Sequence, residues 1–255
     1  MNNGYTLTEL LIAMFITLLV TLSVTKFFLT EHHIYSVQEA RAEMVQTIRG
    51  AINMLSYELV LTGYGIPPDT ERITGFSKDN ITFKTNLRDV KATLSVDTAQ
   101  GETRVDIREG NGRSFERKDI IIICNNSNFD ICEGHILSED GKTDYLKTES
   151  GMSSAFPAGS TVNLINTISY RYNTSRNSVQ RKIDRGNWES VAENVAKDGF
   201  LLSYRDKNEN PPITSSYIHE IDIALTVESF RRDNSFQENN GYRTKSAKTT
   251  VMLRN

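Results

Sequence analysis

The chain opens with an apolar stretch of membrane length and continues with a helical stripe. Leu10–Leu29 is interrupted only by hydroxyl side chains and Lys26. As a helix rising about 1.5 Å per residue, it matches a hydrocarbon core of roughly 30 Å. From Ile34 to Leu59 apolar residues recur every three or four positions, which predicts an amphipathic continuation. Polar residues fill much of the remaining surface, among them Arg41, Glu43, Gln46, Arg49 and Glu58.

No strong helix breaker separates these two parts, so the pattern predicts one long helix from about Thr6 to Thr62, with Gly50 as a candidate bend. The sequence TGYGIPP then stops it, because Gly63 and Gly65 suit a helix C-cap and two prolines follow.

After Pro68 the pattern changes to period two, which predicts β-strands separated by turn-rich pieces. In EIDIALTV, apolar and polar residues alternate from Ile221 to Val227, as in a half-buried antiparallel strand. We interpret WESVAENV as a short helical turn or an extended connector, with Trp188 capping the core. One long helix followed by many antiparallel strands predicts an α+β fold. The predicted strands are RITGF, NITFKTN, KATLSVD, TRVDIRE, KDIIIIC, TVNLINTISYRYN, NSVQRKI, HEIDIALTVES and TTVMLRN.

Charge and the first residues narrow the class of protein. The 29 basic and 32 acidic side chains give a net charge of −3, which argues against a nucleic-acid-binding protein. A secretory signal peptide would need a basic start and a small-residue cleavage site. No Lys or Arg precedes Gly4, and the first alanine beyond the apolar run is Ala40. We therefore expect a single N-terminal membrane helix followed by a large soluble part.

Glu9 is the unusual residue of the first helical turn. Thr6-Leu7-Thr8-Glu9 has the spacing of a capping box, and the helix dipole favours an anion there. A carboxylate at the edge of a membrane-length segment is nevertheless costly, and such residues are functional candidates by default. The cap accounts for Thr6 and Glu9, but it does not account for Gly4 and the aromatic Tyr5 before them.

The stretch Gly4-Tyr5-Thr6-Leu7-Thr8-Glu9-Leu10 resembles the class III signal of type IV pilins and pseudopilins. The resemblance implies that prepilin peptidase cuts after Gly4 and methylates the amine of Tyr5. It also implies that Glu9 pairs with the N-terminal amine of a neighbouring subunit. The sequence departs from the family in its uncharged leader MNNG, in Tyr5 where phenylalanine is commoner, and in Lys26 within the apolar half.

This resemblance divides the chain into four segments. Residues 1–4 are the leader, 5–30 the transmembrane and filament-core half of the helix, 31–62 its amphipathic half, and 63–255 a β-rich periplasmic head. A head of this size is large for a major pilin, which must repeat densely along a fibre.

The later chain is similar to PilW-type minor pilins and to the related J-type pseudopilins in LVLTGYG, WESVAENVAKDGFLLSYRD and VMLRN. This implies a low-copy subunit in a tip or initiation complex that primes pilus assembly. Implied partners are prepilin peptidase, other minor pilins, the major pilin, the inner-membrane assembly platform and lipid. The implied location is the inner membrane, then the pilus. The alternatives are a J-type pseudopilin of a type II secretion system and an anchored binding protein that never polymerises.

Cys124 and Cys132 are the only cysteines, and they flank NNSNFDI. In an oxidising periplasm they would form a disulfide that closes a short loop. By the chain-entropy estimate, this disulfide would stabilise the folded protein by about 2.5 kcal/mol. The alternative is a pair of free thiols in a reducing or anaerobic cell. A zinc site is not expected, because the two cysteines have no neighbouring ligand pair.

The sequence contains no recognisable catalytic motif. None of its four histidines has H-E-x-x-H spacing, and G-x-S-x-G, P-loop and G-x-G-x-x-G patterns are absent. We therefore expect no enzyme activity and no cofactor. Asp206, Asn208 and Asn210 begin like a calcium loop, but Pro211 follows and the twelfth-position glutamate is missing. Calcium is an alternative there and in CNNSNFD, and hairpin loops are the preferred interpretation of both.

Overall fold

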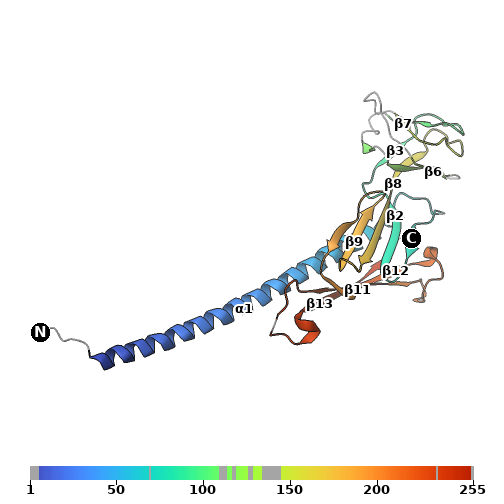
Figure 1. Cartoon of the computed structure of the whole chain (residues 1–255). Helices are drawn as coiled ribbons and strands as arrows, with labels where there is room; N and C mark the ends of the chain where they lie inside the picture. Colours follow the sequence, from blue (N-terminus) through green and yellow to red (C-terminus); the bar gives the residue numbers. More distant parts are fainter. Residues whose placement is uncertain are drawn as a thin grey trace. The chain divides into compact units, whose positions relative to one another are not determined.

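The computed structural model describes residues 6–68, 70–108, 114–116, 119–125, 129–133, 145–233 and 235–253. It confirms a single N-terminal helix, α1 (Leu7–Val60), which is drawn in blue to cyan in Figure 1 and is continuous through Gly50. The helix ends as predicted, because Gly63 and Gly65 adopt φ values of +81° and +75°, which disfavour other residues. The amide of Gly63 then donates to the carbonyl oxygen of Lys84 at 2.9 Å, so the chain passes directly into the first sheet.

The chain divides into two compact units, which we describe separately. Residues 1–46 and 228–245 form the helix-and-loop unit, and residues 47–227 and 246–255 form the sheet unit.

The sheet unit contains an eight-stranded antiparallel sheet whose main path is β1-β2-β8-β5-β6, with β3, β9 and β10 attached. Figure 1 labels β2, β3, β6, β8 and β9 of this sheet. The fold is therefore α+β, as predicted. The bounds of these strands are β1 Ile73–Phe76, β2 Asn80–Thr85, β3 Lys91–Thr93, β5 Ile120–Cys124, β6 Phe129–Glu133, β8 Thr161–Asn173, β9 Ser178–Ile183 and β10 Glu189–Ala192.

Strand β8 organises this sheet because its two halves have different neighbours. Residues 161–163 pair with β3, and residues 161–165 pair with β5. Residues 166–171 pair with β2, and residues 168–173 pair with β9. The thirteen residues of β8 thus connect two packed regions of the sheet unit.

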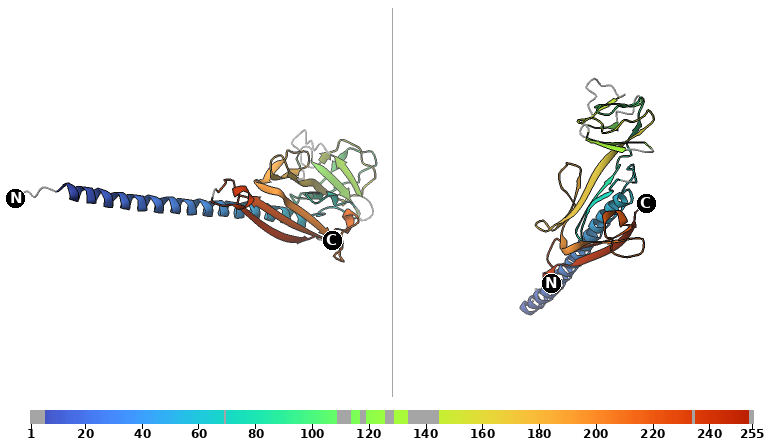
Figure 2. Two further views of the ribbon diagram at one scale, coloured as in Figure 1. Left: turned by 60° about the horizontal axis from the view of Figure 1, so that its bottom comes forward. Right: turned by 90° about the vertical axis from the view of Figure 1, so that its right-hand side faces the viewer.

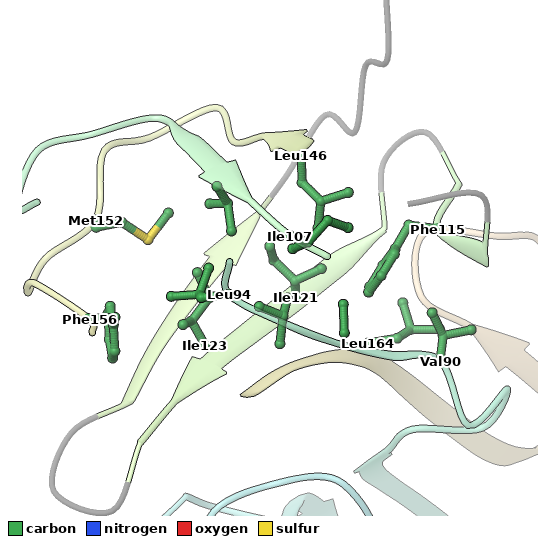
Figure 3. Packing of buried hydrophobic residues seen from close by; sticks show 13 residues of the cluster. Val90, Leu94, Ile107, Phe115, Ile121, Ile123, Leu146, Met152, Phe156 and Leu164 are labelled. Carbon is green, nitrogen blue, oxygen red and sulfur yellow. The ribbon is translucent and has the colours of Figure 1, made fainter. Parts of the chain in front are cut away.

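The larger of two apolar clusters around β5 lies on one face of that strand (Figure 3). Ile121 and Ile123 point into it, whereas Ile122 packs on the other face with Ile66 and Ile165. Burial on both faces explains the uninterrupted isoleucines, since a strand covered on both sides does not alternate. A short two-stranded sheet, β4 (Arg104–Asp106) with β7 (Tyr145–Lys147), adds Val105 and Leu146 to this cluster.

A three-stranded sheet consists of β11 (Val195–Arg205), β12 (Glu220–Glu228) and β13 (Thr244–Met252), drawn in orange to red in Figure 2. Alternate residues of β12 are buried from Ile221 to Val227, which confirms the predicted pattern. Short 3₁₀ turns occupy Ser215–Tyr217 and Glu238–Gly241. Within the sheet unit, the part of α1 from Thr47 onward packs against both sheets, because one small core gap is lined by Leu55 of α1, Tyr170 of β8 and Phe200 of β11.

Two expectations about the later chain are wrong. WESVAENV is not a helical turn: it is extended, and its residues 189–192 pair with β9 as strand β10 instead of serving only as a connector. Trp188 does not cap the core. It is half-buried on the sheet, where the guanidinium of Arg171 lies 4.0 Å and the ammonium of Lys182 lies 5.0 Å from its ring centre. The indole therefore makes cation–π contacts with two strands.

Candidate functional site

The predicted capping box at the start of α1 is present in the structure. The backbone amide of Thr6 donates to Glu9 Oε2 at 2.8 Å, and the amide of Glu9 donates to Thr6 Oγ1 at 3.3 Å. The Thr6 hydroxyl also donates to Glu9 Oε2 at 2.9 Å. These bonds satisfy donors that a helix start leaves without partners. Within the described residues they use only Oε2, so Oε1 of the carboxylate is left for a further donor. Gly4 and Tyr5 lie outside the described residues.

The apolar half of α1 is uncovered. Its large apolar side chains between Leu7 and Leu29 are exposed by 48% at Leu19 up to 76% at Leu7. Among the described residues, α1 is the one helix long and apolar enough to cross a bilayer, and its most apolar window has a mean hydropathy of 2.2 with nothing buried. The segment therefore presents apolar surface on every side, as a helix does when lipid or other helices surround it.

Hydroxyl groups from Thr17 to Thr30 form hydrogen bonds inside the helix. The hydroxyls of Thr17, Thr21, Ser23 and Thr25 each donate at 2.8 Å to the carbonyl oxygen four residues earlier. Thr30 makes the same bond to Lys26 at 2.9 Å. A hydroxyl bonded in this way needs no water, so the segment can enter an apolar surrounding without leaving these donors unpaired.

A buried ionic group connects the far end of α1 to the sheet. Glu58 Oε2 accepts from the Tyr170 hydroxyl at 2.6 Å and from Arg181 Nε at 3.0 Å, while Arg181 Nη2 binds Oε1. Only 3% of Glu58, 1% of Tyr170 and 9% of Arg181 is exposed. Both oxygens of the carboxylate are thereby engaged, in the bidentate arrangement that arginine favours.

The electrostatics of this group follow from burial and contact. Burial and the Glu58 carboxylate both raise the pKa of Tyr170, so its hydroxyl stays a donor. Burial alone would lower the pKa of Arg181, but the bond to Glu58 and its charge outweigh this and raise it. The sequence placed Glu58 with the polar surface of the helix. The missed signal is its position seven residues after Ala51 and three after Leu55, both on the buried face.

The predicted disulfide has no support in the structure. Cys124 is a free cysteine, lies opposite Phe129 in the β5–β6 pair, and is separated by three residues from Ile121, which lies opposite Cys132. Three residues along a strand are about 10 Å, whereas bonded cysteines need Cα atoms about 4.4–6.8 Å apart. Burial raises the pKa of the Cys124 thiol, so it stays protonated. The side chain of Cys132 lies outside the described residues.

The residues considered as a calcium loop, Asp206 to Asn210, form a turn that Asp206 closes by hydrogen bonds. Asp206 Oδ1 accepts from the amides of Asn208 at 2.8 Å and Asn210 at 2.9 Å, so this carboxylate already closes the turn. Across the described ranges of the chain, no three His, Cys, Asp or Glu side chains gather as a metal site. The central residues of CNNSNFD, 126–128, lie outside those ranges.

The helix-and-loop unit contains a groove of about 710 Å³. One wall is α1 from His32 to Glu43, and the other is the connection between β12 and β13, residues 229–243. No sequence motif assigned a function to this connection. Its composition, SFRRDNSF from Ser229 to Phe236, combines exposed aromatic and basic residues and was the available signal.

Comparisons with known proteins concern both the N-terminal segment and the chain as a whole. Residues 1–25 match the family described as the prokaryotic N-terminal methylation motif. A search among curated proteins gave no significant match. Among solved structures, the type IV-like pilin TTHA1219 from Thermus thermophilus is similar at 9% identity over 82% of this chain and 96% of that one, with a TM-score of 0.37. The match to this motif implies processing by prepilin peptidase.

Proposed function

We propose that this chain, a type IV pilin-like protein with a prepilin N-methylation motif, is a minor pilin of a type IV pilus. The observation that carries the proposal is the motif over residues 1–25 joined to an uncovered apolar helix. The subunit waits in the inner membrane with its head in the periplasm. It then enters the filament through the first half of α1.

Processing is the first step of this proposal. Prepilin peptidase cuts between Gly4 and Tyr5, which leaves Tyr5 as the N-methylated first residue. The new terminus directly precedes Thr6, the N-cap of α1, so the cut removes the leader without disturbing the cap. The capped helix thus begins one residue after the processed amine.

Assembly uses the carboxylate of Glu9. Thr6 holds one oxygen, Oε2. In this proposal the other oxygen, Oε1, accepts from the N-terminal amine of a neighbouring subunit. The attraction between carboxylate and amine strengthens in the low dielectric of a filament core. The apolar side chains around this pair then pack against neighbouring helices, which removes them from lipid or water.

The size of the head supports a low-copy role. Residues 63–255 form a larger head than dense repetition along a fibre favours, so we place the subunit in a tip or initiation complex with other minor pilins. The major pilin and the assembly platform of the inner membrane are its further partners. A J-type pseudopilin of a type II secretion system would use the same N-terminal chemistry and differ only in its filament.

The mature N-terminus tests the proposal. We expect mass spectrometry of protein purified from its native membrane to find N-methylated Tyr5 as the first residue. Protein from cells without prepilin peptidase serves as the control and should retain Met1. An intact Met1 in cells with active peptidase would overturn the filament function and favour the anchored binding protein. A quantitative count in sheared filaments then distinguishes a minor subunit from a major one.

A further inference from the structure

The β12–β13 connection contacts α1 at His33, just beyond the apolar run that ends at Leu29. Ser235 Oγ shares a hydrogen bond of 3.1 Å with His33 Nε2, and Asp233 Oδ1 lies 3.9 Å from the same nitrogen. Arg243 donates to Asp233 Oδ2 through Nε at 3.0 Å and Nη2 at 2.7 Å. Its guanidinium also lies 4.8 Å from the ring centre of Phe236. The connection is therefore tied both internally and to the helix.

Three residues of this connection have no comparable role inside the protein. Phe230 is 69% exposed, and Arg231 and Arg232 are both exposed. Neither arginine forms an ion pair with any residue that the structure describes. The stem of Arg232 lies over Gly241, where a Cβ would come within 2.7 Å of Arg232 Cγ, so the glycine makes room for it. An exposed aromatic beside two guanidinium groups without a carboxylate partner among the described residues is therefore available to an external partner.

The distance of Phe230, Arg231 and Arg232 from the hydrocarbon core can be estimated from the position of His33 along α1. His33 is four residues beyond Leu29, which corresponds to about 6 Å along the helix axis. The headgroup layer occupies about 5–7 Å on each side of the hydrocarbon core. Because Ser235 binds His33, the connection lies at the level of the headgroups when the apolar run spans the bilayer.

We propose that Phe230, Arg231 and Arg232 bind the anionic phospholipid surface around the membrane-inserted subunit. The guanidinium groups match phosphate oxygens in geometry and charge, and an aromatic ring is favoured at the bilayer interface. The three acidic side chains of the groove do not compete, and one of them, Asp233, is already bound by Arg243. Glu39 and Glu43 are six and ten residues beyond His33, about 9 and 15 Å further from the bilayer, and pair with neither arginine. The contact holds the β12–β13 connection at the membrane surface before assembly, and it rests on the membrane anchoring proposed above.

A depth measurement on the full chain tests this. Phe230→Trp is reconstituted in vesicles of phosphatidylcholine with or without phosphatidylglycerol, using lipids brominated near the headgroup as quenchers. We expect strong quenching only with the anionic lipid, relative to the wild type, whose single tryptophan is Trp188. Adding Arg231→Gln and Arg232→Gln should abolish that difference, because two arginines near an anionic surface change the ratio of docked to undocked loops by about 30-fold.

The matched control adds Arg176→Gln and Lys207→Gln to Phe230→Trp, which removes the same charge from exposed turns of the sheet unit. It should quench like Phe230→Trp alone. Equal quenching in both lipid mixtures, or equal loss in the control, would overturn the proposal. Reversal by inorganic phosphate at constant ionic strength would identify a free-ion site and overturn it as well. Failure of membrane anchoring is recognised separately, as chain that alkaline carbonate extracts from the vesicles.

Discussion

Removing one partner of the buried Glu58–Arg181–Tyr170 group should strongly destabilise the sheet unit. Glu58→Gln removes the charge that compensates a guanidinium only 9% exposed. Breaking a buried pair by removing one partner costs about 3–5 kcal/mol. Tyr170→Phe deletes one hydrogen bond to a charged acceptor and leaves both arginine bonds intact, so it should cost about 1.5–3 kcal/mol. Since a domain is stable by about 5–15 kcal/mol, the first change removes a large share of the total.

The free energies can be measured by urea unfolding of the detergent-solubilised chain, followed through the fluorescence of Trp188. This indole is a suitable reporter because it contacts Arg171 of β8 and Lys182 of β9. The reasoning is refuted if Glu58→Gln costs no more than Tyr170→Phe. A triple replacement, Glu58→Met with Arg181→Met and Tyr170→Phe, provides the matched test. Because this triple variant also removes the desolvated charges, its free energy of unfolding should be close to that of the wild type. It should therefore be more stable than Glu58→Gln by several kcal/mol.

Three further predictions concern other parts of the chain. Glu9→Ala should leave the protein in the membrane fraction but reduce piliation, counted by electron microscopy; normal piliation would contradict the charge-pair role. The hydrogen bonds of Asp233 with Ser235 and Arg243 lower its pKa to about 2, so the loop should be fully ordered above pH 4 and lose this stabilisation as the pH falls toward 2. Hydrogen exchange at the amide of Ser235 reports it, and Asp233→Asn should remove the pH dependence; an unchanged profile would refute the assignment. Gly63→Ala should lower the thermal midpoint, because φ is +81° and the new Cβ would lie 2.5 Å from Arg72 Cδ; a left-handed non-glycine residue costs about 1–3 kcal/mol, and Gly50→Ala, where nothing lies within 4 Å, is the control.

Regular periodicity made much of the fold predictable. The helix, β8 and β12 follow uninterrupted patterns, and their observed bounds agree with the predicted ones within a few residues. β11 was missed because its pairing with β12 is interrupted between Val195 and Phe200. Asp198 there has a φ of +54°, which breaks the alternation that identifies a strand. β6, β7 and β10 are three to five residues long and too short to show a period.

In the candidate site, contacts between residues close in sequence could be predicted, whereas contacts between distant residues could not. The bond between Thr6 and Glu9 spans three residues, so the capping box could be predicted from spacing alone. Arg181 and Glu58 are 123 residues apart, and His33 and Ser235 are 202 apart. No single sequence indicates which distant charges meet. The cysteine prediction lacked the strand register, which decides whether two residues in a hairpin face each other.

The position of β8 in the chain sets the order in which the larger sheet can be completed. β2, β3 and β5 all pair with β8, yet all three precede it, and Thr82 meets Ser169 across 87 residues. During synthesis, which begins at the N-terminus, β2, β3 and β5 therefore have unpaired edges until the chain has been made as far as residue 173. Such edges invite pairing with other chains. These edges become paired only when β8 is available, because this one strand joins both halves of the sheet.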